Sequence, residues 1–564
     1  MEYEYPPIKL LYCKVMFITY NWRSGMKKAL LILLSVSLVC VFSATTLYAV
    51  EKGGTFNWIA PYGSSVSSLD PNASDDEQNE LVCINIHRGL YKWDAATNTP
   101  KLEVAASVSS SPDGLVYTYK LKDNVKFHNG RQLTVDDVIY TYNRIMNPAN
   151  AFGASGLLKV IKGADDVFNG KADTIAGLKK IDDLTLEITM ELPVDPAYAL
   201  FKVNTAIVPR EAVEDKVNPF GSNPIGCGPF KFVKWVKGSE IVLEKFGDFY
   251  EAGKPYLDTL VYKIMGDSAA RDIAFRAKEL DANILYSSQY AAYSVDSELS
   301  KRLIEVAEMY TRMIAFNREY TLADGRKPFE DKRVRQAFNY AIDSDLIIKK
   351  FQKNKAYPAI SFLAPTTPGF DPAAQRYTYN PALAKKLMQE AGYADGFPLE
   401  IVGTDSDSYG TGAVEVIIPF LKEIGIQVKP VTLEGAAKYE RQKNGDFQAI
   451  IGSLPSGPDP IQSLWRFHSS TDRASRNTPA FNNPQFDQYL EAAAAERTDM
   501  VKRLDYVKKA NDLFREEAPI WFFNYNKAII AYQPWVHGIQ AVGPEMMFQD
   551  FTEVWVESSS PRAK

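Results

Sequence analysis

The sequence predicts an α/β fold divided into two or three lobes. Strands and helices alternate through the second half of the chain, which is the pattern of a mainly parallel sheet covered by helices. The first half shows short strands of alternating apolar and polar residues separated by turns. About 515 residues follow residue 49, which is more than one hydrophobic core normally holds.

The elements expected in the first half follow local pattern and turn chemistry. They are a strand and loop over 53–71, a helix over 77–88, a strand–turn–strand unit over 115–130, and strand pairs over 179–190 and from residue 226. Asn129-Gly130 and Lys237-Gly238 are the expected hairpin turns. Thr134 is a suitable N-cap for a helix that carries acidic residues in its first turn.

The second half is expected to be an α/β lobe. Helices are expected over 333–341, 346–351, 380–392, 412–425 and 487–517, and strands over 398–404, 426–433 and 447–453. Gly392 and Gly425 close two of these helices. The chain has no repeats and no low-complexity linker, so short crossings are expected to join its domains.

The N-terminal region predicts export from the cytoplasm. Lys27 and Lys28 precede an apolar stretch over 29–42, and small and polar residues follow up to Ala49. This is the order of a secretory signal peptide, which we expect over 26–49, with cleavage after Ala49. Residues 1–25 carry no export signal, so we expect Met26 to be the true start and residues 1–25 to be a mis-called extension.

Two alternatives to a cleaved signal peptide remain open. An apolar stretch of this length could stay in the membrane as an uncleaved anchor, although Thr and Ser at its end favour cleavage. Cys40 could be a lipidation site, but the preceding Val39 is larger than such sites usually accept.

Charge and cysteine content narrow the class of protein further. The first 49 residues hold five of the Lys and Arg and two of the Asp and Glu, so the remaining chain has a net charge of −8. An acidic surface argues against nucleic acid as a partner. Cys83 and Cys227 remain after export, and either one disulfide or two buried thiols fits them.

We find no pattern of catalytic or metal-binding residues. The four histidines, His87, His128, His468 and His537, lack metal-ligand spacing. There is no GxSxG nucleophile motif and no phosphate-binding loop. The acidic loop from Asp405 fails as a calcium loop because Val416 stands where a bidentate Glu is required. The sequence therefore favours a non-enzymatic binding protein without a cofactor or metal.

Six segments in order together resemble the family 5 extracellular solute-binding proteins of ABC importers, the peptide/nickel-type group. They include VKFHNG before TVDDV, NPIGCGPFKF and RVRQAFNYAID. The six segments cover residues 87–94 with 111–142, 223–235, 316–343, 379–393, 445–464 and 518–538. Each motif alone is weak, but their collinear order across the chain is specific.

The resemblance implies the two-lobed periplasmic-binding-protein fold, type II, cluster C, with an extra subdomain in the first lobe. The expected first lobe comprises 50–90, 207–312 and 521–564, the subdomain 91–206, and the second lobe 313–520. The C-terminal tail is expected to return to the first lobe.

The resemblance also implies a function. We expect a periplasmic, monomeric substrate-binding component of an ABC transporter, which captures a peptide or a similar small polar solute by hinge closure and docks on a membrane permease driven by an ATPase. A nickel or metal-chelate carrier and a sugar-binding protein are the alternatives within this class. A secreted hydrolase is the alternative from a different class.

The site residues implied by the resemblance lie on loops that follow strands. Peptide-binding members commonly place an Asp for the peptide's α-amino group where this chain has Ser456, and a Ser cannot neutralise an ammonium. The nearby Asp459 is expected to be a turn residue. The full set of expected ligand contacts is Tyr62, Ser64, Ser65, Asn317, Asp405, Ser456 and Trp465. Arg312 and Arg376 either meet a ligand carboxylate or form salt bridges.

Overall fold

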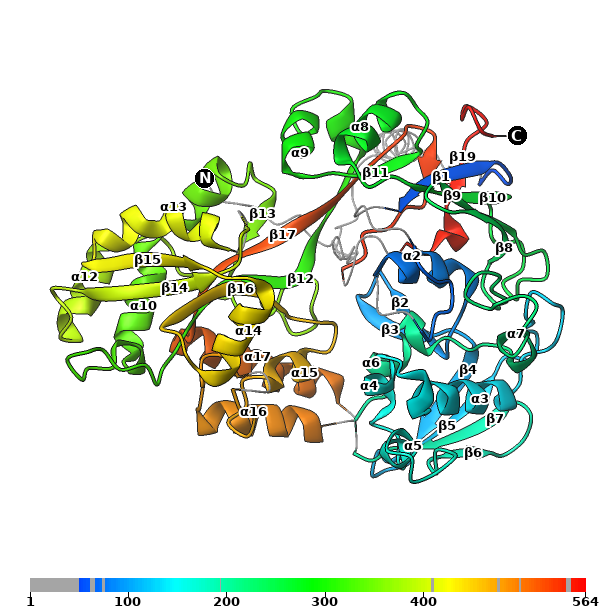
Figure 1. The fold of residues 1–564 in the computed structure, drawn as a ribbon, viewed down its shortest axis with the longest axis horizontal. Helices are drawn as coiled ribbons and strands as arrows, with labels where there is room; N and C mark the ends of the chain where they lie inside the picture. The colour runs from blue at the N-terminus through cyan, green and yellow to red at the C-terminus, as the bar shows by residue number, and fades with distance from the viewer. Residues whose placement is uncertain are drawn as a thin grey trace, which may run out of the picture. The chain divides into compact units, whose positions relative to one another are not determined.

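The computed structural model describes residues 50–60, 66–73, 77–192, 194–406, 410–473, 477–496, 499–543 and 549–563. The chain divides into residues 1–50 and residues 51–564, and every described helix and strand belongs to the second part. This second part is built from two lobes, each with its own sheet (Figure 1).

The sheet of the first lobe has four strands in the order β1-β10-β9-β8. The strands are β1 (Thr55–Ala60), β8 (Phe230–Val236), β9 (Glu240–Lys245) and β10 (Thr259–Ile264). β1 runs parallel to β10, while β8 and β9 form the hairpin predicted at Lys237-Gly238. Gly238 has φ +72°, a left-handed conformation that favours glycine at this turn.

Helix α2 (Glu77–Ile86) confirms the helix expected over 77–88 and packs against this sheet. Its residues Leu81, Val82 and Ile86 are fully buried in the core of the lobe. The remaining elements of the lobe are α7 (Arg210–Val213), α8 (Ser268–Arg276), α9 (Ser287–Tyr293), β18 (Val536–His537) and β19 (Trp555–Val556). Cys83 and Cys227 are both buried free thiols.

A subdomain is inserted between β1 and β8. Its elements are β2 (Tyr91–Asp94), β3 (Thr99–Leu102), β4 (Ala105–Ser110), β5 (Val116–Leu121), α3 (Val135–Met146), α4 (Ser155–Leu158), α5 (Ala164–Phe168), β6 (Leu178–Lys180), β7 (Thr185–Thr189) and α6 (Ala197–Leu200). β2 pairs with β3, and the second sheet has the order β4-β5-β7-β6. α3 begins after Thr134 as predicted, because the Thr134 N–H donates to the Asp137 carboxylate at 2.9 Å.

The prediction of a second strand after the turn at Asn129-Gly130 is wrong. The turn itself is present, but the segment forms only an isolated bridge between Lys126 and Gln132. β5 already has β4 on one side and β7 on the other, so no edge of β5 is open to a further strand.

The second lobe is built on a seven-stranded sheet in the order β11-β17-β12-β16-β14-β15, with β13 also paired to β17. The strands are β11 (Ala282–Ile284), β12 (Leu303–Phe316), β13 (Ala356–Pro358), β14 (Phe397–Gly403), β15 (Ile426–Thr432), β16 (Ala449–Pro455) and β17 (Ile520–Tyr532). The prediction of a mainly parallel sheet is wrong, because only the β14–β15 and β14–β16 pairs are parallel. β16 and β17 both run antiparallel to β12, the strand that enters from the first lobe.

Helices cover both faces of this sheet (Figure 1). They are α10 (Lys332–Ala341), α11 (Ser344–Lys350), α12 (Pro381–Glu390), α13 (Thr411–Lys422), α14 (Gly435–Asn444), α15 (Pro460–Trp465), α16 (Pro484–Ala495) and α17 (Met500–Glu517). α10, α12 and α13 pack on the face that carries Ile314 and Phe316, whereas α15, α16 and α17 pack on the face that carries Met313 and Ala315. The alternation along β12 therefore gives each face of the sheet its own core.

The single helix predicted over 487–517 is wrong, because the structure has α16 and α17 instead. The carboxylate of Asp499 accepts a hydrogen bond from the Lys502 N–H at 3.0 Å and so caps the start of α17. An amphipathic pattern continues through the break because both helices bury one face in the same core.

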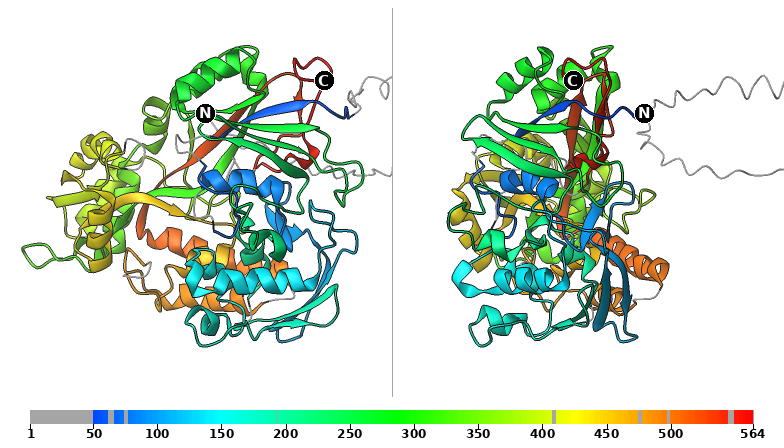
Figure 2. Two further views of the ribbon diagram at one scale, coloured as in Figure 1. Left: turned by 45° about the vertical axis from the view of Figure 1, so that its right-hand side comes forward. Right: turned by 90° about the vertical axis from the view of Figure 1, so that its right-hand side faces the viewer.

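Two long strands, β12 and β17, link the lobes (Figure 2). They pair antiparallel from Leu303 opposite Ala531 to Ala315 opposite Ile520, with register shifts between. At one end Ile529 and Ile530 are buried in the core of the first lobe, and at the other end Ile520 is buried in the second. A strand pair of this kind can twist while each lobe keeps its core.

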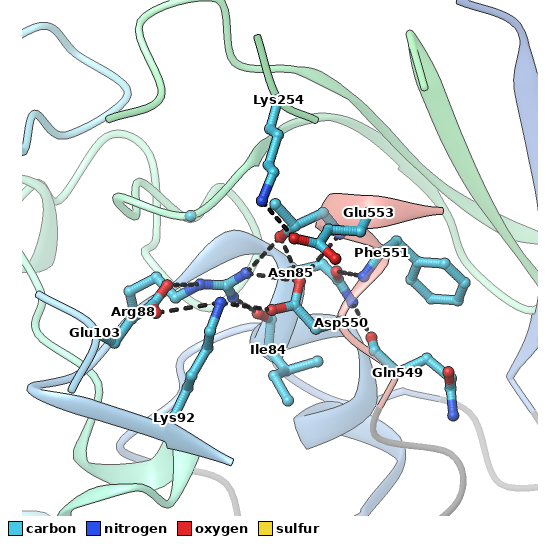
Figure 3. Close-up of polar contacts among 12 residues, drawn as sticks. Ile84, Asn85, Arg88, Lys92, Glu103, Lys254, Gln549, Asp550, Phe551 and Glu553 are labelled. Carbon is cyan, nitrogen blue, oxygen red and sulfur yellow. Dashed lines mark hydrogen bonds and ion pairs between the residues drawn. The ribbon is translucent and has the colours of Figure 1, made fainter. Parts of the chain in front are cut away.

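The chain returns to the first lobe at its C-terminus, where a buried ion network holds it (Figure 3). The Arg88 guanidinium binds Glu103 at 3.0 Å and Asp550 at 2.9 Å, and Lys92 binds the same two carboxylates at 3.1 and 3.3 Å. Arg88 is 3% exposed and Glu103 is 2% exposed. The side-chain amide of Asn85 adds bonds to the backbone of Gln549 and Phe551. The end of α2 and the residues just after it thus bind the subdomain and the C-terminal segment together.

We expect Arg88→Met to lower the free energy of unfolding by about 3–5 kcal/mol, because it leaves the buried Glu103 and Asp550 with less positive charge. Urea unfolding followed by circular dichroism measures this loss. Arg210→Met is the matched control, since Arg210 pairs with Glu214 at the surface and should cost at most about 1 kcal/mol. Equal losses in the two variants would show that the network does not hold the fold.

The same network predicts a loss of stability in acid. Burial alone would raise the pKa of Asp550, but Arg88 and Lys92 outweigh it and hold that pKa well below its ordinary value. The unfolded chain therefore binds a proton at Asp550 before the folded one does, and stability falls as the pH drops below about 4. Melting temperatures between pH 6 and pH 3 should fall less steeply in Asp550→Asn than in the unchanged protein. Parallel curves for the two proteins would contradict this assignment.

Candidate functional site

The two lobes approach closely near the linking strands, at the backbone of Gly543. A Cβ atom on Gly543 would lie 2.8 Å from the Cβ of Thr366 in the second lobe and 2.9 Å from Oδ1 of Asn98 in the subdomain. Asn98 stands at the turn between β2 and β3, and the Thr366 hydroxyl donates to the Ala307 carbonyl on β12 at 3.1 Å. A residue without a side chain is needed at 543 for the lobes to meet in this way.

A second approach joins α6 of the subdomain to α15 and α17 of the second lobe. Burial together with the carboxylates of Asp459 and Asp195 raises the pKa of Tyr198 to about 12. Arg503 on α17 acts on the same phenol and also on Asp459. A tyrosine of one lobe therefore shares its electrostatic environment with charged groups of the other.

A cavity of about 60 Å³ opens in the first lobe between these two approaches. Trp93 and Phe201 form its aromatic wall, with ring centroids 5.1 Å apart. Trp93 lies on β2, which leads to Asn98, and Phe201 ends the helix that carries Tyr198. The lining also includes Ile84 on α2, Arg88 just after it, and Gln540, Val542 and Asp550 of the C-terminal segment.

The cavity combines apolar surface with fixed polar groups. Burial would lower the pKa of Lys92, but Asp550 and Glu103 outweigh it and raise that pKa, so the ammonium stays charged at the cavity wall. Lys202 lies over the Phe201 ring at 5.3 Å. The indole N–H of Trp93 is buried and has no hydrogen-bond partner among the described residues. An aromatic wall with a few convergent polar groups is the composition of a small-molecule site, although the volume of this cavity lies well below the roughly 300 Å³ at which such sites begin.

The loop after β16 faces this region from the second lobe. Ser456 is fully buried, and its hydroxyl accepts from the Ala364 N–H at 3.2 Å. The Thr367 hydroxyl lies 3.3 Å from it and donates to the Gly457 carbonyl at 3.2 Å. Since Thr366 next to it meets Gly543, the Ser456 loop belongs to the zone where the lobes approach.

Asp459 has the turn role predicted for it. Its carboxylate caps α15 by accepting from the Ile461 N–H at 2.9 Å and from the Gln462 N–H at 3.3 Å. Burial raises the pKa of this carboxyl group. The capping bonds hold Asp459 in its own lobe.

Two further predicted residues lie in the same lobe and remain predictions. Asp405 is exposed directly after β14, at the carboxyl end of the parallel strands, where ligands bind in open α/β sheets. Trp465 ends α15, is half-buried, and stacks on His468 with centroids 4.5 Å apart and parallel rings. The stacking fixes the orientation of the indole.

Asn317 is bound within the second lobe. Its amide donates to the carbonyls of Gly445 at 3.1 Å and Phe447 at 2.7 Å, and its oxygen accepts from the Glu319 N–H at 3.1 Å. These bonds join the end of β12 to the start of β16. Tyr62, Ser64 and Ser65 lie outside the described residues.

The two arginines weighed for a ligand carboxylate both bind protein groups. Arg376 forms a two-point contact with Asp345, at 2.8 and 2.7 Å. Arg312 donates to the Ser453 hydroxyl and lies 3.4 Å from Glu308. The salt-bridge alternative is therefore the one that the structure shows for Arg376.

Sequence reasoning missed Trp93 and Phe201 as site residues. Trp93 lies within a segment that carries the family resemblance, and it shares a strand face with Tyr91, which packs in the core of the subdomain. The sequence signal that could have indicated Trp93 was a tryptophan in a short two-stranded sheet next to a turn. Phe201 had none, because only the fold brings it to Trp93.

The described residues include no cluster of His, Cys, Asp and Glu that could hold a metal ion. His87 and His128 are structural: burial lowers the pKa of each to about 3, and each lies within hydrogen-bond distance of a backbone carbonyl.

Comparison with known proteins identifies the family. Residues 99–475 match the model of the bacterial extracellular solute-binding proteins, family 5, middle region. The chain belongs to this family. It is therefore an extracellular solute-binding protein of two lobes, and the relatives that it resembles are binding proteins, not enzymes.

Curated relatives match along most of their length. The dipeptide-binding protein of Escherichia coli strain K12 is 26% identical over 88% of this chain and 92% of the relative. The glutathione-binding protein GsiB of Pectobacterium atrosepticum is 27% identical over 83% of this chain and 88% of the relative. The heme-binding protein A of Haemophilus influenzae is 28% identical over 82% of this chain and 84% of the relative.

Solved structures share the fold. The periplasmic murein tripeptide-binding protein MppA, in its unliganded open form, has a TM-score of 0.80 at 21% identity, over 90% of this chain and 98% of that one. The ABC transporter substrate-binding protein CtaP of Listeria monocytogenes has a TM-score of 0.71 at 25% identity, over 90% of this chain and 100% of that one.

We expect Ser456→Asp to destabilise the protein more than Ser456→Ala does. The alanine leaves the buried Ala364 N–H unpaired, at a cost of about 1–3 kcal/mol, whereas the aspartate also brings an unpaired charge into a fully buried position. Urea unfolding of both variants measures the difference. An aspartate variant that is as stable as the unchanged protein and gains affinity for dipeptides would instead show that residue 456 reaches the solute.

Proposed function

We propose that this protein is the extracytoplasmic substrate-binding component of an ABC importer and captures a peptide or a similar small polar solute between its lobes. The observation that carries the proposal is the position of the Trp93–Phe201 cavity. Val542 in its lining precedes Gly543, which meets Thr366 of the second lobe, and Phe201 follows the helix that carries Tyr198. All of the lining residues belong to the first lobe, and we propose that a solute held there reaches the second lobe at these two approaches.

Such contacts supply the driving force for hinge closure. A solute that contacts one lobe alone binds the open and closed forms equally and does not shift the equilibrium between them. A solute that contacts both lobes favours the closed form. β12 and β17 carry the motion, because each strand belongs to both cores. Binding needs only contact surface and hydrogen bonds, so no residue has to act as a nucleophile or a general base.

Export and transfer of the solute complete the proposal. Residues 26–49 serve as a cleaved signal peptide, and the monomeric protein delivers its solute to permease and ATPase subunits in the cytoplasmic membrane. Among the described residues, no helix has the length and apolar character needed to cross a bilayer. The names of relatives that bind dipeptides, glutathione and heme support an organic solute. We also propose the lobe boundaries expected from the sequence, with crossings near residues 312 and 520.

We expect a bound peptide to raise the melting temperature and to make the protein more compact. At a hundred times its dissociation constant, a solute that binds the folded state stabilises it by about 2.7 kcal/mol. A thermal-shift screen of residues 50–564 against dipeptides, tripeptides, glutathione and sugars finds the solute. Small-angle scattering with and without that solute then measures closure.

Trp93→Ala tests whether the cavity is part of this site, and Tyr439→Ala, an exposed aromatic of the second lobe, is the control. Trp93→Ala should weaken binding of the identified solute by about tenfold or more, since the ring supplies one wall of the cavity. Tyr439→Ala should leave affinity unchanged. Chemical turnover of a bound solute, or failure of every solute class to bind, would overturn the proposed function.

A further inference from the structure

Lys438 lies at the edge of the second-lobe sheet where a solute is expected to bind. β15 ends at Thr432, α14 begins at Gly435, and the Lys438 N–H donates to the Glu434 carbonyl in the first turn. The first turn of α14 therefore lies at the carboxyl edge of β14, β15 and β16. Asp405 and the Ser456 loop follow strands at this same edge.

The ammonium of Lys438 lies over β16, where Gly452 has no side chain to displace it. Nζ lies 3.1 Å from the position that a Cβ atom of Gly452 would occupy. Gly452 is buried and is followed on β16 by Ser453. Ser456 comes directly after the end of this strand. A larger residue at 452 would push the lysine off the strand, so the pair Gly452 and Lys438 brings a cation onto the sheet edge.

No acidic side chain in the described part of the chain lies within ion-pair distance of Lys438. Other lysines of this lobe, such as Lys508 and Lys332, bind carboxylates. Burial lowers the pKa of Lys438, and no described charge acts on it in either direction. The residue is nevertheless only half-buried, so a solute can reach it. A half-buried cation of this kind lacks the partner that such groups normally have.

Neither Asp459 nor the Ser456 loop neutralises the charge of Lys438. Asp459 is held by the N–H groups of α15, and Ser456 is neutral and bound within its lobe. The loop that would carry a carboxylate for an α-amino group has Ser456, Gly457 and Pro458 before Asp459. Asp405 is exposed at the same edge, but no described charge acts on Lys438, so a solute group that reaches Lys438 itself meets a positive charge.

We propose that Lys438 binds a carboxylate of the transported solute, so that the second lobe selects an anionic organic solute over one presenting a free ammonium group. This inference rests on the proposed function, because it requires that solutes bind at the carboxyl edge of this sheet. It adds the charge of the solute and the residue that recognises it. A carboxylate on Nζ forms a charge-assisted hydrogen bond, which strengthens as closure excludes water.

The test compares probes that differ only in charge. N-acetyl-Ala-Phe carries a carboxylate and no ammonium, whereas Ala-Phe amide carries an ammonium and no carboxylate; glutarate and citrate are anions without a peptide. Isothermal titration calorimetry measures the affinity of each probe for the unchanged protein, for Lys438→Met and for Lys443→Met. Lys443 is the matched control because it is an exposed lysine of the same helix.

We expect at least one anionic probe to bind the unchanged protein and Lys443→Met alike. Lys438→Met should weaken that probe by about tenfold to a hundredfold, the usual worth of a hydrogen bond to a charged group. Gly452→Val, which forces the ammonium away without removing it, should weaken the same probe. Circular dichroism establishes that the variants fold.

The outcomes separate the two proposals. If Ala-Phe amide or a neutral solute binds and no anion does, or if Lys438→Met binds anions as well as the unchanged protein, the charge assignment is overturned while the proposed function stands. If no probe and no solute of the thermal-shift screen binds, the proposed function fails and this inference fails with it.

Discussion

The contact between Arg88 and its two carboxylates holds together parts of the chain that are far apart in sequence. Glu103 belongs to the subdomain, Asp550 to the C-terminal segment, and Arg88 follows α2. Because Arg88 and Glu103 are buried and Asp550 is only 22% exposed, the loss of one group leaves an uncompensated charge away from bulk water. Arg88 and Asp550 also line the Trp93–Phe201 cavity, so the interaction that stabilises the lobe also shapes this cavity.

The fold then separates rigid parts from the part that moves. Each lobe has a dense apolar core, and helices cover both faces of the second sheet. Among the described strands, only β12 and β17 run through both cores, and their pairing contains register shifts between Ala307 and Thr311 and after Arg312. Irregular pairing weakens the ladder locally and increases its twist. The lobes can therefore change their angle at this level without disturbing the packing of either.

Local pattern was sufficient to predict most elements, and the failures have physical causes. Thr134, Lys237-Gly238 and the three strands β14, β15 and β16 carry strong local signals, and the structure has them in place. The break at Asp499 was hidden because α16 and α17 bury faces in one core, which preserves the amphipathic period. The direction of β16 and β17 against β12 depends on how the chain crosses between lobes, and no local pattern reports that.

The site was harder to predict than the fold for a similar reason. The loops after β14 and β16 follow from the general position of ligands in α/β sheets, so Asp405 and Ser456 could be chosen from sequence. Asn317 satisfied the same rule, but its amide bonds hold two strand ends together. Trp93, Phe201 and Lys438 gain their positions from contacts with distant residues, and Gly452 matters only because a lysine from another element lies over it.

The lysines of the two lobes, Lys92 and Lys438, also differ in how the loss of water on closure would affect their charge. On the first lobe Lys92 is already paired with Glu103 and Asp550, so the removal of water changes its balance of charge little. On the second lobe Lys438 has no described partner, and closure without a solute would remove water from a bare ammonium. That cost opposes empty closure, whereas a solute carboxylate converts it into a favourable ion pair in a region of low dielectric. In the proposed binding mode, the unpaired ammonium of Lys438 would therefore oppose closure without a solute and favour closure around an anion.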